Sequence, residues 1–158
     1  MNKNPYADAL GAREPVEVIA STPEKLGVLL GGLSAEQIER RPAPGKWCVR
    51  EIMAHLTDCE IAFSFRLRQG VAGVETVQPF DQDDWARSYG AYSFPAALSA
   101  HRALRAWNVA FIRSLTEEQR ARTLMHPERG AMTVGSIVET MAGHDRHHLA
   151  GLEKMLAG

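Results

Sequence analysis

One stretch of the sequence, residues 133–156, repeats its apolar side chains at helical spacing and so limits the folds open to the chain. Thr133 can cap a helix at its start, because its hydroxyl accepts a hydrogen bond from a free N–H of the first turn. Eight apolar residues then share one face of that helix: Val134, Ile137, Val138, Met141, Leu149, Leu152, Met155 and Leu156. The stretch therefore predicts one long helix of a buried helical core.

Two histidines fall on the buried side of this predicted helix. At about 100° per residue, His148 lies inside the apolar face and His144 at its edge, whereas His147 lies outside it. The Cβ atoms of residues i and i+4 are about 6 Å apart, so the two inward imidazoles are neighbours. An unpaired buried polar group costs about 1–3 kcal/mol, and a metal ion could serve both rings. The alternative pair is His144 with His147, which is disfavoured because His147 lies outside the apolar face of the helix.

Three further long helices are predicted, over Glu14–Leu30, Cys48–Ala72 and Ser93–Leu115. The first can also be read as two helices, because Thr22-Pro23 resembles a fresh N-cap followed by proline. Residues 1–13 are polar and are expected to be held loosely.

Shorter signals lie between the long helices. Ser34–Gln37 and Thr116–Gln119 are capping boxes, and Asp81–Trp85 resembles a short capped helix within a long crossover, 73–92. No segment is a convincing strand, since Val74–Val77 is short and broken. The fold class is therefore predicted as all-α, a four-helix bundle with long crossovers whose order need not be simple up-and-down.

Composition limits the class of protein further. The 158 residues suit one domain, 1–158, and the net charge of −1 gives no support for binding nucleic acid or an anionic membrane. No apolar run reaches the roughly 18 residues of a membrane span, and the first residues carry no signal-peptide pattern. Cys48 and Cys59 lie about 16 Å apart along one predicted helix, too far for a disulfide. A cytoplasmic location is expected.

His55 lies within the apolar stripe of the second long helix, so His55, His144 and His148 all face inward. Neutral imidazole is a preferred ligand for zinc, nickel, copper and iron, and an i,i+4 histidine pair with a third ligand builds a three-residue site. Such a site keeps a coordination position for water or substrate. These residues are the predicted metal ligands, whereas the sequence leaves the catalytic acid or base unknown.

Other residues have both a functional and a structural interpretation. Glu51 and Asp58 can orient a ligand imidazole or be solvated charges. Cys48 can be a reactive thiol at a helix start, and Cys59 a fourth ligand, although packed inert thiols are the default for both. Arg66, if buried, needs a carboxylate partner or binds an anionic substrate.

Three polar residues receive a structural interpretation from the sequence alone. Asp145 follows His144 by one residue, so it points about 100° away and is expected at the surface. His101 and His126 are expected to be exposed or to make local contacts. Each of the three tryptophans is expected to be a packing residue rather than a platform for a substrate: Trp47, Trp85 and Trp107.

Five segments together resemble the DinB/YfiT-like superfamily: GKWCVREI (45–52), AHLTDCE (54–60), FDQDDWA (80–86), HPERG (126–130) and GHDRHHL (143–149). The resemblance implies a four-helix bundle of atypical order, often homodimeric, with a nickel or zinc ion on His55, His144 and His148. It also implies a hydrolase or a thiol transferase acting on a small molecule, with a low-molecular-weight thiol as one expected partner. Cys48 stands where many relatives have Ser or Thr.

Two functions follow as hypotheses. The first is a divalent-metal-dependent enzyme, hydrolytic or thiol-transferring, with the three histidines around one ion. The alternative is a non-catalytic metal-binding or stress-response module with a structural metal, favoured by the lack of a clear acid or base facing the histidines.

Overall fold

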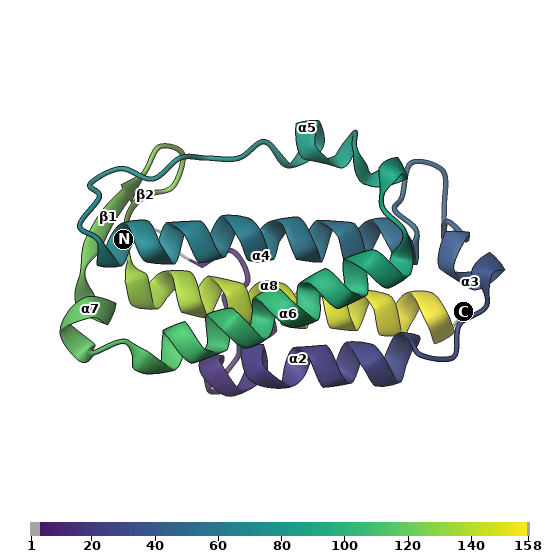
Figure 1. The fold of residues 1–158 in the computed structure, drawn as a ribbon, viewed down its shortest axis with the longest axis horizontal. Coiled ribbons are helices and arrows are strands. Elements are labelled where there is room, and N and C mark those ends of the chain that lie inside the picture. The colour runs from purple at the N-terminus through teal and green to yellow at the C-terminus, as the bar shows by residue number, and fades with distance from the viewer. Residues whose placement is uncertain (1–3, 158) are drawn as a thin grey trace.

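The computed structural model describes residues 4–157, whose four long helices form a bundle (Figure 1). These helices are α2 (Pro15–Leu30), α4 (Val49–Val71), α6 (Phe94–Ser114) and α8 (Val134–Ala157). The predicted four-helix bundle is thus confirmed, and α2 continues through Pro23 as a single helix. Within the described range, no helix combines the length and apolar character that crossing a membrane requires.

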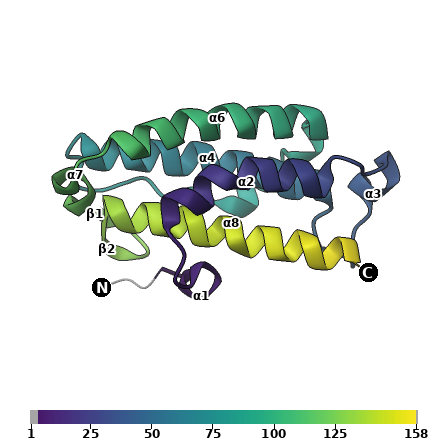
Figure 2. The ribbon, with the colours of Figure 1, turned by 90° about the horizontal axis from the view of Figure 1, so that it is seen from below.

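The helices are not arranged in simple up-and-down order. α4 packs against α6 and α8, and α2 packs against the same two helices, so the consecutive helices α2 and α4 lie on a diagonal (Figures 1 and 2). The segment after α4 runs back along the bundle before α6 begins, which makes α4 and α6 parallel (Figure 1). A 23-residue helix is about 34 Å long, and this return explains the long crossover predicted from the sequence.

Short elements fill the connections. The predicted capping boxes are present, with Ser34 and Gln37 opening one short helix and Thr116 and Gln119 another. Asp81 caps a third through hydrogen bonds from two backbone N–H groups. These elements are α1 (Ala7–Leu10), α3 (Ala35–Glu39), α5 (Gln82–Ala86), the 3₁₀ turn η1 (Tyr89–Ala91) and α7 (Glu117–Ala121).

A two-stranded antiparallel hairpin, β1 (Thr123–His126) and β2 (Gly130–Thr133), lies where no strand was expected. Each strand has only four residues, too few to show a reliable alternation of polar and apolar side chains. Gly130 has φ 75°, a conformation that glycine adopts without steric cost. The backbone of Met125 bonds Glu75 and Val77, which fixes the start of the crossover to the hairpin.

The N-terminal segment packs along α8 (Figure 2). Leu10 is buried in the core, and Tyr6 lies over Gly143, where a Cβ would come within 2.5 Å of the Tyr6 carbonyl oxygen. Of the segment expected to be held loosely, residues 1–3 lie outside the described part of the chain.

Two apolar clusters fill the ends of the bundle, and a polar layer lies between them. At its centre Arg105 on α6 donates two hydrogen bonds to Asp145 on α8, one of them 3.0 Å long. Its Nε donates to Glu60 on α4 at 2.9 Å, and Asn108 donates to the other oxygen of Glu60 at 2.8 Å. His101 packs beside Arg105 and is fully buried.

This layer decides two expectations from the sequence. Asp145 does point away from the face that carries His144, but that direction leads into the bundle toward Arg105 rather than to solvent. His101 is not exposed, because α6 turns it into the same layer, and its contact with Arg105, four residues along the helix, is of the local kind that the sequence also allowed. Periodicity of apolar residues does not reveal a polar layer, since its members interrupt the apolar pattern.

Replacement of Arg105 by methionine should destabilise the protein by about 3–5 kcal/mol, because it leaves two buried carboxylates without their cation. Urea denaturation measures the loss. Arg113→Met is the matched control, since Arg113 pairs with Glu17 on the surface and should cost about 0–1 kcal/mol. Equal effects of the two substitutions would contradict a structural role for the Arg105 network.

Candidate metal centre

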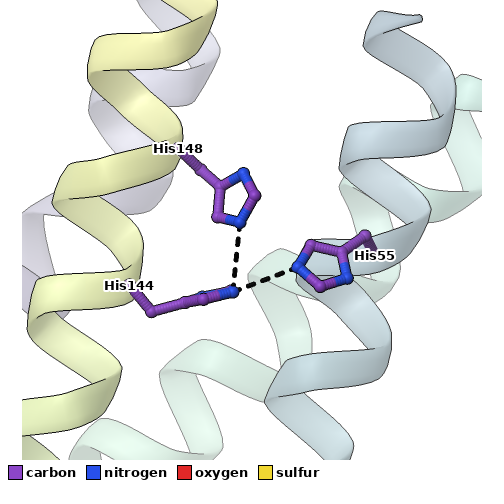
Figure 3. A group of neighbouring side chains, drawn as sticks. All are labelled: His55, His144 and His148. Carbon is purple, nitrogen blue, oxygen red and sulfur yellow. Dashed lines mark hydrogen bonds between the residues drawn. The ribbon is translucent and has the colours of Figure 1, made fainter. Parts of the chain in front are cut away.

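The three histidines predicted as ligands come together between α4 and α8 (Figure 3). His55 projects from the buried stripe of α4, while His144 and His148 project from successive turns of α8. The two helices pack against each other, so the rings meet in the space between them. His55 is 1% exposed and His144 is 4% exposed, and His148 is half-buried.

The Nε2 atoms of the three rings converge. His144 Nε2 lies 3.0 Å from His55 Nε2 and 3.1 Å from His148 Nε2. A neutral imidazole nitrogen carries either a proton or a lone pair, so His144 Nε2 cannot make a good hydrogen bond to both neighbours. A cation between the rings removes this conflict, because all three nitrogens can then present lone pairs. Nitrogens bound at about 2.0–2.1 Å to one ion lie about 3.0–3.4 Å apart, which fits the two distances from His144 Nε2.

The surroundings keep the three rings neutral. Burial lowers the pKa of His55 to about 4, helped by the neighbouring His147. Burial and the charge of His55 lower the pKa of His148 to about 3. His144 has a pKa well below its ordinary value, again chiefly through burial. Neutral imidazole is the form that binds metals, so at neutral pH the rings need lose no protons to act as ligands.

Aromatic side chains hold two of the rings in place. Trp47 packs on His55 with ring centroids 4.9 Å apart, and Tyr6 packs edge-on against His144 at 5.2 Å. The Tyr89 hydroxyl lies 3.4 Å from His55 Nδ1, where its oxygen can accept a hydrogen bond from Nδ1–H; with the ring proton on Nδ1, Nε2 keeps its lone pair for a metal. Sequence reasoning assigned no such role to Tyr6 or Tyr89, which come from distant segments without a local pattern.

The alternative candidates for a role at this centre have other partners. Glu51 accepts a hydrogen bond from the backbone N–H of Cys48 at 2.9 Å and pairs with Arg41, so it serves the helix start. The Cys48 thiol is buried, which raises its pKa and disfavours the reactive thiolate. Asp58 is half-buried and has no hydrogen bond to a ligand ring among the described residues.

Cys59 lies against His55 but outside the set of converging nitrogens. Its sulfur is 3.6 Å from His55 Nε2 and 3.7 Å from Nδ1, beside the ring. Burial raises the pKa of this thiol to about 12, so it stays protonated at neutral pH. The structure therefore favours the packed-thiol interpretation over a fourth ligand.

A cavity of about 840 Å³ opens beside the histidines. His148 and His147 lie in its wall together with Trp47, which also packs on His55. Among the described residues, no carboxylate contributes to its lining, which is basic and apolar: Arg40, Arg41, Lys46, Lys154, Pro42, Ile52 and Met155. A small molecule in this cavity would have access to the ligand ring of His148.

The fold and the site together are those of a helical bundle with a candidate metal site between two facing helices. The chain belongs to the DinB superfamily, whose sequence profile matches residues 19–152. A proposed metal-dependent hydrolase of Oceanobacillus iheyensis is 30% identical over 145 residues, covering 90% of this chain and 84% of that protein. Another from Geobacillus kaustophilus is 30% identical, covering 87% and 80% of the two chains.

Solved structures share the fold. YfiT from Bacillus subtilis, described as a probable metal-dependent hydrolase with an unusual four-helix bundle topology, superposes with a TM-score of 0.82. It is 21% identical, with 89% of this chain and 83% of that chain covered. A mycothiol-dependent maleylpyruvate isomerase superposes with a TM-score of 0.72 at 14% identity, covering 93% of this chain and 62% of that one. The likeness to YfiT confirms the atypical helix order.

The metal-free protein should lose stability as the pH falls. Unfolded histidines bind protons below about pH 6.5, whereas His55 and His148 stay neutral in the fold until about pH 4 and about pH 3. Protonation therefore favours the unfolded chain, by about 1–2 kcal/mol per histidine between pH 6.5 and 5. Chemical denaturation across this range measures the slope.

Two variants separate this cause from other titrations. His55→Asn should reduce the slope, because it removes one group with a depressed pKa. His147→Asn should reduce it less, since His147 is exposed and acts on His55 and His148 only through its charge. A profile that is flat from pH 7 to 5 would contradict the assignment of neutral, buried imidazoles.

Proposed function

We propose that this protein is a divalent-metal-dependent enzyme that acts on a small molecule by hydrolysis or thiol transfer. His55, His144 and His148 hold the ion, with nickel or zinc as the expected metal. The observation that carries the proposal is the convergence of three neutral Nε2 atoms beside a cavity large enough for a substrate. Three protein ligands leave a coordination position for water or substrate.

The chemistry of the ligands fits such an ion. Three imidazoles suit zinc and nickel, and their spacing agrees with ligands of one ion. A bound divalent ion supplies Lewis acidity, which lowers the pKa of a coordinated water to about 7 or stabilises a substrate thiolate.

Residues of the cavity suggest how a substrate is held. Arg40, Lys46 and Lys154 provide positive charge on a surface without carboxylates, which favours a thiolate or another anion. Trp47 supplies an apolar face next to the histidines. The exposed imidazole of His147 lies 5.2 Å from the His148 ring, centroid to centroid, and is the proposed group for moving a proton at the cavity wall.

Similar proteins support both reaction types. The bacterial relatives at 30% identity carry names of metal-dependent hydrolases, which favours hydrolysis. The isomerase with the same fold is described as mycothiol-dependent, which favours a thiol as co-substrate.

A structural ion is the second candidate function, because two of the three rings are almost completely enclosed. His55 and His144 expose 1% and 4% of their surface, so an ion there would tie α4 to α8 whatever its chemical role. In that case the protein would be a metal-binding module without catalysis.

His144→Ala should abolish metal binding, because His144 Nε2 is the nitrogen that adjoins both other ligands. Elemental analysis of the purified proteins should find about one divalent ion per wild-type chain and almost none in the variant. His147→Ala is the control, since it removes an imidazole from the next turn of the same helix but outside the converging set, and it should keep the metal. Full retention of metal by His144→Ala would refute the proposed centre.

Removal of the metal separates the two functions. An ion that binds only the folded state stabilises it by about 4 kcal/mol at a thousandfold excess over its dissociation constant, so chelation should lower the melting temperature in either case. Turnover of thiol and ester substrates that disappears on chelation and returns with zinc or nickel supports the enzyme. A large loss of stability, without turnover in the loaded protein, supports the structural ion.

A further inference from the structure

Two buried arginines, Arg105 and Arg66, differ in whether a carboxylate neutralises their charge. Arg105 pairs with two carboxylates, whereas Arg66, on α4 near the hairpin, pairs with none in the described part of the chain. Only 6% of Arg66 is exposed. Its Nε and Nη2 atoms reach the Gln78 carbonyl oxygen at 3.4 Å, longer than an ordinary N–H···O hydrogen bond. Its guanidinium also lies 5.5 Å from the centre of the Phe80 ring.

A second arginine and a histidine lie beside Arg66. Arg66, Arg129 and His126 line one cavity of about 600 Å³, between α4, the crossover and the turn of the hairpin. Among residues 4–157, no carboxylate lies within 4.0 Å of either guanidinium. The mutual proximity of the charges is reflected in the pKa of Arg66, which burial and Arg129 both lower.

His126 adds a neutral donor. It is buried rather than exposed, and its hydrogen bond is local, which is the second of the two roles expected from the sequence. Its Nδ1 accepts a hydrogen bond from the backbone N–H of Glu128 at 3.2 Å, which leaves the ring proton on Nε2. Burial lowers the pKa of His126, with Arg66 and Arg129 adding to the effect, so the ring stays neutral at pH 7.

We infer that this cavity is a binding site for a small oxyanion, the carboxylate or phosphate group of an organic molecule, held by Arg66, Arg129 and the His126 Nε2–H. A buried guanidinium cannot lose its proton and is costly without a counter-ion, and its planar fork matches the oxygens of carboxylate and phosphate. The site stands apart from the proposed metal centre, because its lining includes none of the three converging histidines. Residues of two segments that take no part in the metal centre, FDQDD and HPERG, line this cavity.

Acidic residues at the same cavity restrict the ligand. Asp81, Asp83 and Glu128 are exposed, and Asp81 already accepts two backbone N–H groups as the cap of α5. Their charge repels an extended polyanion such as nucleic acid, while a small anion can reach the arginines inside them. The ligand class is therefore a small organic acid or phosphate ester.

Indole N–H signals in ¹H–¹⁵N spectra provide a local test. Trp85 packs on Phe80 with centroids 4.9 Å apart and reports on this cavity, Trp47 reports on the cavity at the histidines, and the exposed Trp107 is an internal control. Titration with sodium phosphate or sodium succinate, against sodium chloride of equal ionic strength, should shift the Trp85 signal saturably. Trp107 should not move. Saturation by phosphate alone or succinate alone identifies which oxyanion the site prefers.

Arg129→Gln and Arg66→Gln should each weaken this binding about tenfold or more, since hydrogen bonds to charged groups are among the stronger ones in proteins. Arg87→Gln is the matched control, because it removes the same charge near Trp85 from an exposed arginine that pairs with Asp84. If the Arg66→Gln variant does not fold, the affinity of Arg129→Gln alone tests the proposed site.

Absence of a saturable shift at Trp85 with either anion, or equal affinity in wild type and Arg129→Gln, would overturn the inference. The same titration of His144→Ala distinguishes the two sites. Anion binding that persists in this variant shows that the oxyanion site is independent of the metal centre, whether or not the metal proposal holds. Binding that is lost in this variant while its fold is retained would overturn the assignment of a separate site.

Discussion

The pairing of Arg105 with Asp145 is the contact on which the arrangement of the site depends. It joins α6 to α8, and the bond from Arg105 to Glu60 joins both to α4. Asp145 immediately follows His144, so the rotation of α8 that satisfies Arg105 also directs His144 toward α4. Burial of charge is costly unless the geometry of the pairing is good, which makes incorrect rotations of α8 unfavourable. The polar layer thus specifies one helix arrangement where apolar packing alone would tolerate several.

At the converging histidines, burial keeps the side chains neutral instead of enclosing paired charges. Around Arg105 every charge has a partner. The three rings, in contrast, are kept neutral, and His144 Nε2 cannot make good hydrogen bonds to both neighbouring Nε2 atoms. Such a cluster is poorly satisfied by the protein itself. Trp47 and Tyr89 nevertheless hold His55 in place, so the cluster does not relieve the conflict by rotating that ring outward. A cation site requires nitrogen lone pairs that have no hydrogen-bond donor and rings that are held in a fixed orientation.

Sequence periodicity located the long helices and the inward direction of the three histidines, because both follow from 3.6 residues per turn. It could not place Asp145, since a helix packed on several sides has no single buried face, and the partner, Arg105, is 40 residues away. The hairpin escaped prediction because its strands have only four residues and are stabilised by pairing rather than by pattern. Tyr6 and Tyr89 reach the site from segments that only the folded chain brings near, so no local signal marks them.

The contrast between Arg105 and Arg66 suggests how buried charge can be interpreted in this bundle. A guanidinium matched by two carboxylates contributes to the fold, and its removal is felt as lost stability. A guanidinium as buried as Arg66, with only a distant carbonyl as acceptor, adds a desolvation cost that the fold does not offset. A bound anion would offset that cost by supplying the missing negative charge. The crossover that carries Phe80 packs over Arg66, and the return path imposed by the parallel α4 and α6 brings it there. The same topology that lengthens the connection therefore creates the second cavity.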